Sequence, residues 1–80
     1  MVSKTNGIVL NYIKYKETSI ISKIYTKEFG LKSYLINGVR TKKGKFNISS
    51  FQPLSLLELV VYENKNSQIG RIKELKFDKI

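Results

Sequence analysis

Short segments with the residue types and the two-residue alternation of β-strands fill most of the sequence. The clearest alternation lies in Ile20–Thr26, where residues 20, 22, 24 and 26 fall on one face and 21, 23 and 25 on the other. Similar runs, rich in β-branched and aromatic residues, predict four further strands. Their ranges are Ile8–Tyr15, Leu31–Ile36, Leu54–Tyr62 and Ile69–Phe77. The sequence therefore predicts an all-β protein, although the apolar spacing of three in the last segment leaves a helix there as an alternative.

Turn signals separate these strands. Lys27–Gly30 has the composition of a hairpin turn in which Gly30 supplies a positive φ, and Asn37-Gly38 ends the third strand. The apolar residues 46, 48 and 51 have a spacing compatible with one short helical turn before Pro53. Five strands with a short helical turn between strands 3 and 4 describe a five-stranded OB-fold barrel. An SH3-like barrel has a similar strand count, and the interruption after strand 3 favours the OB-fold.

The length and the missing residue types exclude several kinds of protein. Eighty residues make one domain, 1–80. The sequence has no Cys and no His, and its six carboxylates are scattered, so we expect neither an enzyme nor a cofactor or metal site. No apolar run approaches the roughly 20 residues of a membrane-spanning helix, and the N-terminus has no signal-peptide pattern. A cytoplasmic location is consistent with these features.

The net charge of +9 is unevenly distributed. Residues 1–45 carry ten Lys and Arg against two Glu, whereas residues 46–80 carry five against four acidic residues. An imbalance of this kind is typical of a protein with one face or end that meets a polyanion. The alternative is a lysine-rich surface that reflects coding bias, because Lys, Ile and Asn are all frequent.

Arg40–Lys45 is the most strongly charged segment, with four cationic residues among six. Like charges packed this closely repel one another, so the cluster stabilises nothing until a counter-charge binds. Neutralising phosphates releases condensed cations, which drives binding without reading sequence. A solvated loop without a partner is the alternative. We interpret the segment as a contact with nucleic acid, without sequence preference.

An OB-fold binds oligonucleotides across strands 2 and 3, between the loops after strands 1 and 4. Those loops are predicted at residues 16–19 and 64–67. Lysines on the strands can meet phosphates, and tyrosine rings can stack on bases at about 1–3 kcal/mol each; the alternative is that both tyrosines on strands 2 and 3 cap the barrel core. The candidate DNA-binding residues are Lys14, Lys16, Lys23, Tyr25, Lys32, Tyr34, Arg40, Lys42, Lys43 and Lys45.

The order and spacing of these segments resemble the N-terminal domain of RecO, the bacterial recombination mediator. The resemblance covers nearly the whole sequence, and no single motif carries it. The matching segments are Gly7-Ile8-Val9-Leu10, Tyr15-Lys16-Glu17-Thr18-Ser19, Thr26-Lys27-Glu28-Phe29-Gly30, Asn37-Gly38-Val39-Arg40 with Lys42-Lys43, Phe51-Gln52-Pro53-Leu54, Leu57-Glu58-Leu59, and Arg71-Ile72 with Glu74-Leu75.

The resemblance implies an OB-fold that binds single- and double-stranded DNA and supports strand annealing in recombinational repair, in the bacterial cytoplasm and associated with the nucleoid. It implies partners as well: RecR, the RecA recombinase and single-strand-binding protein. The family continues into a helical domain, in many members with a cysteine zinc site, and no such part is present here. The family often has an arginine-rich loop; this sequence has one Arg and three Lys there, which favours phosphate contact over guanidinium stacking.

Two rival interpretations remain. The domain could mainly hold a protein partner such as RecR, with DNA binding secondary. An RNA-binding OB-fold fits the composition equally well and is separated from the first interpretation only by the family pattern.

Overall fold

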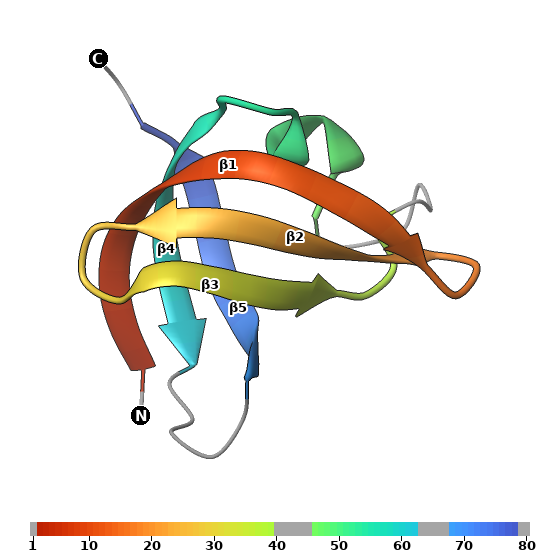
Figure 1. The fold of residues 1–80 in the computed structure, drawn as a ribbon, viewed down its shortest axis with the longest axis horizontal. Helices are drawn as coiled ribbons and strands as arrows, with labels where there is room; N and C mark the ends of the chain where they lie inside the picture. Colours follow the sequence, from red (N-terminus) through yellow and green to blue (C-terminus); the bar gives the residue numbers. More distant parts are fainter. Residues whose placement is uncertain (1, 40–45, 63–67, 79–80) are drawn as a thin grey trace.

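A computed structural model describes residues 2–39, 46–62 and 68–78. Within these residues the chain forms five β-strands and one short 3-10 helix (Figure 1). Their bounds are β1 Val2–Tyr15, β2 Ser19–Thr26, β3 Gly30–Ile36, η1 Ile48–Phe51, β4 Leu56–Tyr62 and β5 Ile69–Phe77. The predicted strand order and the helical turn between strands 3 and 4 are confirmed, and the last segment is a strand. No helix in the described ranges is long and apolar enough to cross a membrane.

The strands form a closed barrel in the order β1-β2-β3-β5-β4. β1 belongs to both sides of the barrel, because Val2–Ile8 pairs with β4 and Gly7–Tyr15 pairs with β2. In Figure 1 the strands β1, β2 and β3 cross in front of β4 and β5, and the hairpin between β1 and β2 projects to the right. A short parallel pairing of β3 with β5 closes the barrel. Together with the helical turn after β3, this is the OB-fold.

The core lies between the strands and is sealed on one side by η1. Phe51, the last residue of η1, is fully buried, as are the inward residues of β2. Asn47 caps η1, since its side-chain oxygen accepts from the Ser49 N–H at 2.9 Å. The buried apolar residues are Val9, Ile20, Ile24, Tyr34, Ile36, Val39, Phe51, Leu57, Leu59, Val61 and Ile72.

β1 starts at Val2, six residues earlier than the sequence predicts. Polar residues dominate this first half, and its inward positions are Thr5 and Gly7, which carry no strand signal. The barrel leaves no space for a side chain at Gly7, because a Cβ there would lie 2.6 Å from Ile24 Cγ2. The first half becomes a strand because β4 pairs with it, a long-range contact that no local pattern encodes.

β4 starts at Leu56 and not at Leu54 as predicted. Leu54 has a φ of 71°, its N–H donates to the Val9 carbonyl at 2.7 Å, and the Ser55 N–H donates to the Gln52 carbonyl at 3.1 Å. Residues 52–55 are therefore a turn that leads from η1 into β4.

The two predicted glycine turns are confirmed, since Gly30 and Gly38 both have a φ of 70°. At the β2–β3 turn, the buried Thr26 hydroxyl donates to the Gly30 carbonyl at 2.8 Å and accepts from the Phe29 N–H at 3.0 Å. The Glu28 N–H donates to the Thr5 hydroxyl at 3.0 Å, which ties the turn to β1. The predicted loop at residues 64–67 lies outside the described residues.

Candidate nucleic-acid interface

The tip of the β1–β2 hairpin presents two of the predicted lysines. Lys14 and Lys16 are both exposed. Lys16 has a φ of 57°, which allows the chain to reverse after β1, and its Nζ lies 5.5 Å from the centre of the Tyr15 ring. This distance is within the range of a cation–π contact. The tip thus combines cationic groups with a partly exposed aromatic ring, and Tyr15 is a candidate contact that the sequence analysis missed.

Lys23 and Tyr25 lie together on the outer face of β2, as the alternation predicts. The tyrosine is 59% exposed, and its neighbours in register are Ile8 on β1 and Leu31 on β3. Lys23 is opposite Ser33 on β3, one position further along the same face. An exposed aromatic ring and an ammonium group on one face are the two groups that a single-stranded nucleic-acid contact uses.

Tyr34 does not belong to this surface. Its side chain is 3% exposed and is part of the core. The ring packs over Gly70, where a Cβ would lie 2.9 Å from Tyr34 Cε1. The predicted stacking of a base on Tyr34 is therefore wrong, and the alternative, a tyrosine that completes the barrel core, is correct for this residue.

The predicted lysines do not share one face. Lys14 is in register with Ile20, and Lys32 with Ile24, so both lysines start from the core-facing side of their strands. Both remain exposed. Lys23, by contrast, lies on the outer face. The structure brings together Lys23 with Tyr25, and separately Lys14 with Lys16, as two basic groups.

Aliphatic side chains accompany the tyrosine, which the sequence analysis did not foresee. Ile8, Tyr25 and Leu31 form a cross-strand row and are 38%, 59% and 58% exposed. A second apolar row crosses the same face at Ile13, Ile21 and Leu35, and Lys23 lies in the polar row between the two. Alternation in each strand gives the face, but only the register between strands shows that these residues form rows. The predicted loop Arg40–Lys45 lies outside the described residues.

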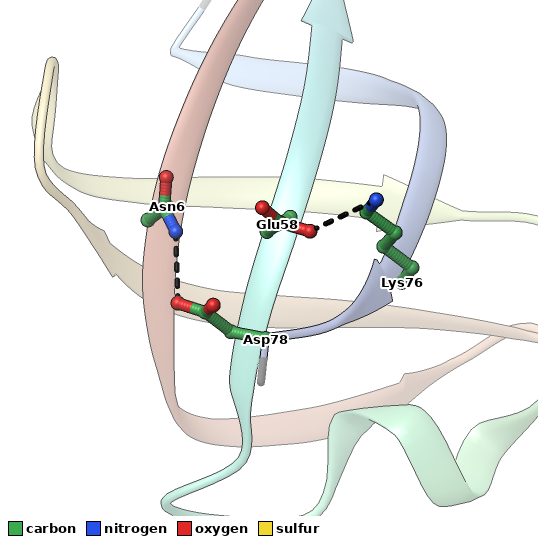
Figure 2. A network of polar contacts seen from close by, with 4 residues as sticks. All are labelled: Asn6, Glu58, Lys76 and Asp78. Carbon is green, nitrogen blue, oxygen red and sulfur yellow. Dashed lines mark hydrogen bonds and ion pairs between the residues drawn. The ribbon is translucent and has the colours of Figure 1, made fainter. Parts of the chain in front are cut away.

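The outer face of β1, β4 and β5 has a different character. Figure 2 shows the Lys76 ammonium 3.2 Å from a Glu58 carboxylate oxygen, and the Asn6 amide donating to Asp78 at 2.8 Å. A hollow of about 330 Å³ opens on this face, lined by side chains of both signs. With Lys4 of β1 included, β4, β5 and Asp78 bring four basic residues against three acidic ones. Such a nearly balanced surface attracts a polyanion only weakly.

Among the described residues, no group of three or more acidic side chains lies close enough to hold a metal ion. The positive charge of the described barrel is concentrated in β1, β2, β3 and their turns. Residues 8–36 carry five lysines against Glu17 and Glu28.

Comparison with known proteins gives a consistent match. A family model described as "Recombination protein O N terminal" matches residues 1–79. DNA repair proteins RecO from Bacteroides fragilis and Phocaeicola vulgatus are each 42% identical over 76 residues, which is 95% of this chain and 31% and 32% of those proteins. RecO from Prosthecochloris aestuarii is 32% identical over 74 residues, covering 92% of this chain and 28% of that protein.

This chain spans about a third of the length of the curated relatives that it matches. The family match extends over all five strands and η1. Sequence identity, matched length and fold agree, and the chain belongs to the RecO N-terminal domain family.

Proposed function

We propose that this domain binds single- and double-stranded DNA without reading its sequence, as the DNA-contacting part of a recombinational repair protein. The observation that carries the proposal is the segregation of charge. Lysines dominate β1, β2, β3 and their turns, whereas β4 and β5 carry three basic residues against two acidic ones. Phosphate contacts from lysine ammonium groups release counterions and give binding that weakens with salt.

The Lys23–Tyr25 pair extends the proposal to single strands. An exposed ring beside an ammonium group allows one nucleotide to stack its base and to place its phosphate near the charge. Duplex DNA offers phosphates but no free base faces, so it engages the lysines alone. Arg40–Lys45 adds four cations to the same chain. Binding of both DNA forms would support strand annealing and the loading of a recombinase, in a bacterial cytoplasmic protein acting alongside RecR, RecA and single-strand-binding protein.

The test compares two variants that lose equal charge on different sides of the barrel. The first replaces Lys14, Lys16 and Lys23 with Gln; the matched control replaces Lys4, Lys73 and Lys76 with Gln. Affinity for a labelled single strand is measured across a salt series by fluorescence anisotropy. The log–log slope falls by about two in the first variant, at about 0.7 for each phosphate that is no longer neutralised, and changes little in the control.

Equal changes of slope in the two variants would show that only net charge matters and would end the proposal of a DNA-binding side. A third variant, with Arg40, Lys42, Lys43 and Lys45 changed to Gln, measures the contribution of that segment. Its slope should fall by roughly two to three, at about 0.7 per phosphate. Thermal unfolding of each variant checks that the barrel is intact.

A second function, protein docking, is favoured by the aliphatic row Ile8–Tyr25–Leu31. Phosphates and bases do not require exposed aliphatic side chains, whereas a protein partner such as RecR buries them. The discriminating variant is Leu31→Ser, which preserves every lysine. Loss of partner binding with DNA affinity unchanged supports docking on this face; loss of neither leaves the DNA proposal as the only role of the face.

A further inference from the structure

The second half of β1 has one paired edge and one edge without a described partner. β4 accompanies β1 from Val2 to Ile8. Val9 makes the last contacts on that side, donating its N–H to the Ser55 carbonyl at 3.0 Å and accepting from the Leu54 N–H at 2.7 Å. From residue 10 to residue 15, β1 pairs with β2 alone among the described residues. Alternate residues of an antiparallel strand direct their N–H and C=O groups to opposite edges, so part of this backbone faces outward.

This edge is long enough and apolar enough to accept another strand. Six residues at about 3.3 Å each give roughly 20 Å, the length of an ordinary strand. Leu10, Ile13 and Tyr15 are 42%, 62% and 40% exposed. The bulge between Val9 and Asn11 turns this half of β1 away from β4. An exposed edge with apolar side chains is a template for strand addition.

We propose that residues 10–15 of β1 bind an extended acidic segment of a partner protein as an additional β-strand. The charge of the edge selects the partner. Lys14 lies within the edge, Lys16 follows it and Lys23 is on the adjacent strand, with Glu17 as the acidic residue nearby in sequence. A second copy of this chain would bring a further +9 to the contact, so the charge disfavours pairing of two β1 edges.

Lysine on an edge strand is also a common protection against unwanted pairing. The same lysine explains both effects. When a neutral or basic strand pairs beside it, the ammonium group loses hydration without compensation, so such pairing is disfavoured. When an acidic strand pairs beside it, a carboxylate replaces the lost water, so this pairing is favoured. Ile13 and Lys14 lie on opposite faces of β1. A bound segment that alternates apolar and acidic residues would therefore place an apolar side chain beside Ile13 and a carboxylate beside Lys14.

The site shares Lys14 and Lys16 with the proposed DNA contacts, so DNA and an acidic segment compete for these two lysines. A strand added along β1 extends the sheet sideways and leaves the Lys23–Tyr25 surface uncovered.

The probe is a capped, fluorescein-labelled peptide of alternating glutamate and valine, long enough to span residues 10–15. Binding to the 80-residue chain is measured by anisotropy at about 0.15 M salt, and amide exchange is followed by NMR. We expect slower exchange at alternate amides of residues 10–15, with no slowing at Leu57–Val61. Absence of binding up to about millimolar peptide, or exchange effects around Lys27 and Lys32 without any at residues 10–15, would overturn the proposal.

Two matched comparisons separate strand addition from charge attraction. Lys14→Glu should weaken peptide binding at least about tenfold, and Lys27→Glu, with the same net charge, less than about threefold. In the peptide, N-methylation of the residues that donate to β1 should weaken binding at least about tenfold, while methylation of the alternate residues changes it little. Equal effects of the two methylation patterns would exclude a β-strand and overturn the proposal.

Discussion

Leu54 has an unfavourable backbone conformation that burial of its side chain does not offset. Its φ of 71° lies in the left-handed region, and the side chain is 77% exposed. A Cβ in this region costs about 1–2 kcal/mol, and glycine avoids that cost. Leu54→Gly should therefore raise the free energy of unfolding by about 1 kcal/mol, measured by urea denaturation, while Leu54→Ala should leave it within about 0.5 kcal/mol. A destabilised glycine variant would show that the Leu54 side chain contributes contacts.

Tyr25 and Tyr62 are both exposed tyrosines, on different sides of the barrel. Because only Tyr25 lies beside Lys23 on the proposed DNA side, Tyr25→Leu should weaken binding of a single strand by about 1–3 kcal/mol. Tyr62→Leu is the matched control and should change it little. The same substitutions should have smaller effects on duplex binding, since a duplex exposes no base face; anisotropy with both DNA forms gives the comparison. Equal losses for the two variants would contradict stacking on Tyr25.

Tyr25 and Tyr34 show what can be predicted for single residues. Period-two alternation correctly placed Tyr25 with Lys23, because each strand has its own inward and outward sets. The same rule places Tyr34 and Lys32 on one face of β3, and both lie on its core-facing side. Their exposure differs because Lys32 extends into solvent while the Tyr34 ring fills the space over Gly70. Position along a barrel strand decides this, and it depends on the closure of β3 with β5, which residue patterns do not contain.

At the scale of elements, the turn between β2 and β3 is held by a buried hydroxyl that makes two hydrogen bonds to it. Thr26 is 2% exposed and its hydroxyl bonds both the Gly30 carbonyl and the Phe29 N–H. Thr26→Val keeps the shape and leaves both backbone groups without that partner, so we expect a loss of about 1–3 kcal/mol in thermal or urea unfolding. Thr18→Val, at the exposed tip of the other hairpin, is the control. A neutral Thr26→Val variant would show that water replaces the hydroxyl.

Strand boundaries were predicted best where residue type and burial agree. β5 has its predicted bounds, and β2 and β3 each start one residue earlier. The first half of β1 was missed because its inward residues, Thr5 and Gly7, are small or polar and become buried only against β4 and Ile24. The start of β4 was placed too early because the apolar Leu54 resembles a strand residue, while its backbone forms a turn. Both errors concern long-range or backbone effects that local composition does not report.

For the molecule as a whole, the side-chain charge comes from Lys, Arg, Asp and Glu alone. The sequence has no His and no Cys, the side chains whose ordinary pKa values lie closest to physiological pH. We therefore expect affinity for DNA to vary by less than about twofold between about pH 6 and pH 7.5 at fixed ionic strength. Anisotropy titrations across this range provide the measurement. A tenfold change would point to a carboxylate or lysine with a strongly displaced pKa at the interface.

The pairing of β3 with β5, which closes the barrel, affects the order in which the domain folds. It consists of Ser33 with Ile69 and Tyr34 with Gly70, residues far apart in the chain. During synthesis, β1, β2 and β3 leave the ribosome before β5 exists, and contacts this distant form late because their loop-closure entropy must first be offset. The three lysine-bearing strands are therefore synthesised before the residues of β4 and β5 that complete the core. We expect Tyr34 to become protected from solvent only when Gly70 arrives, as the last event in the assembly of the domain.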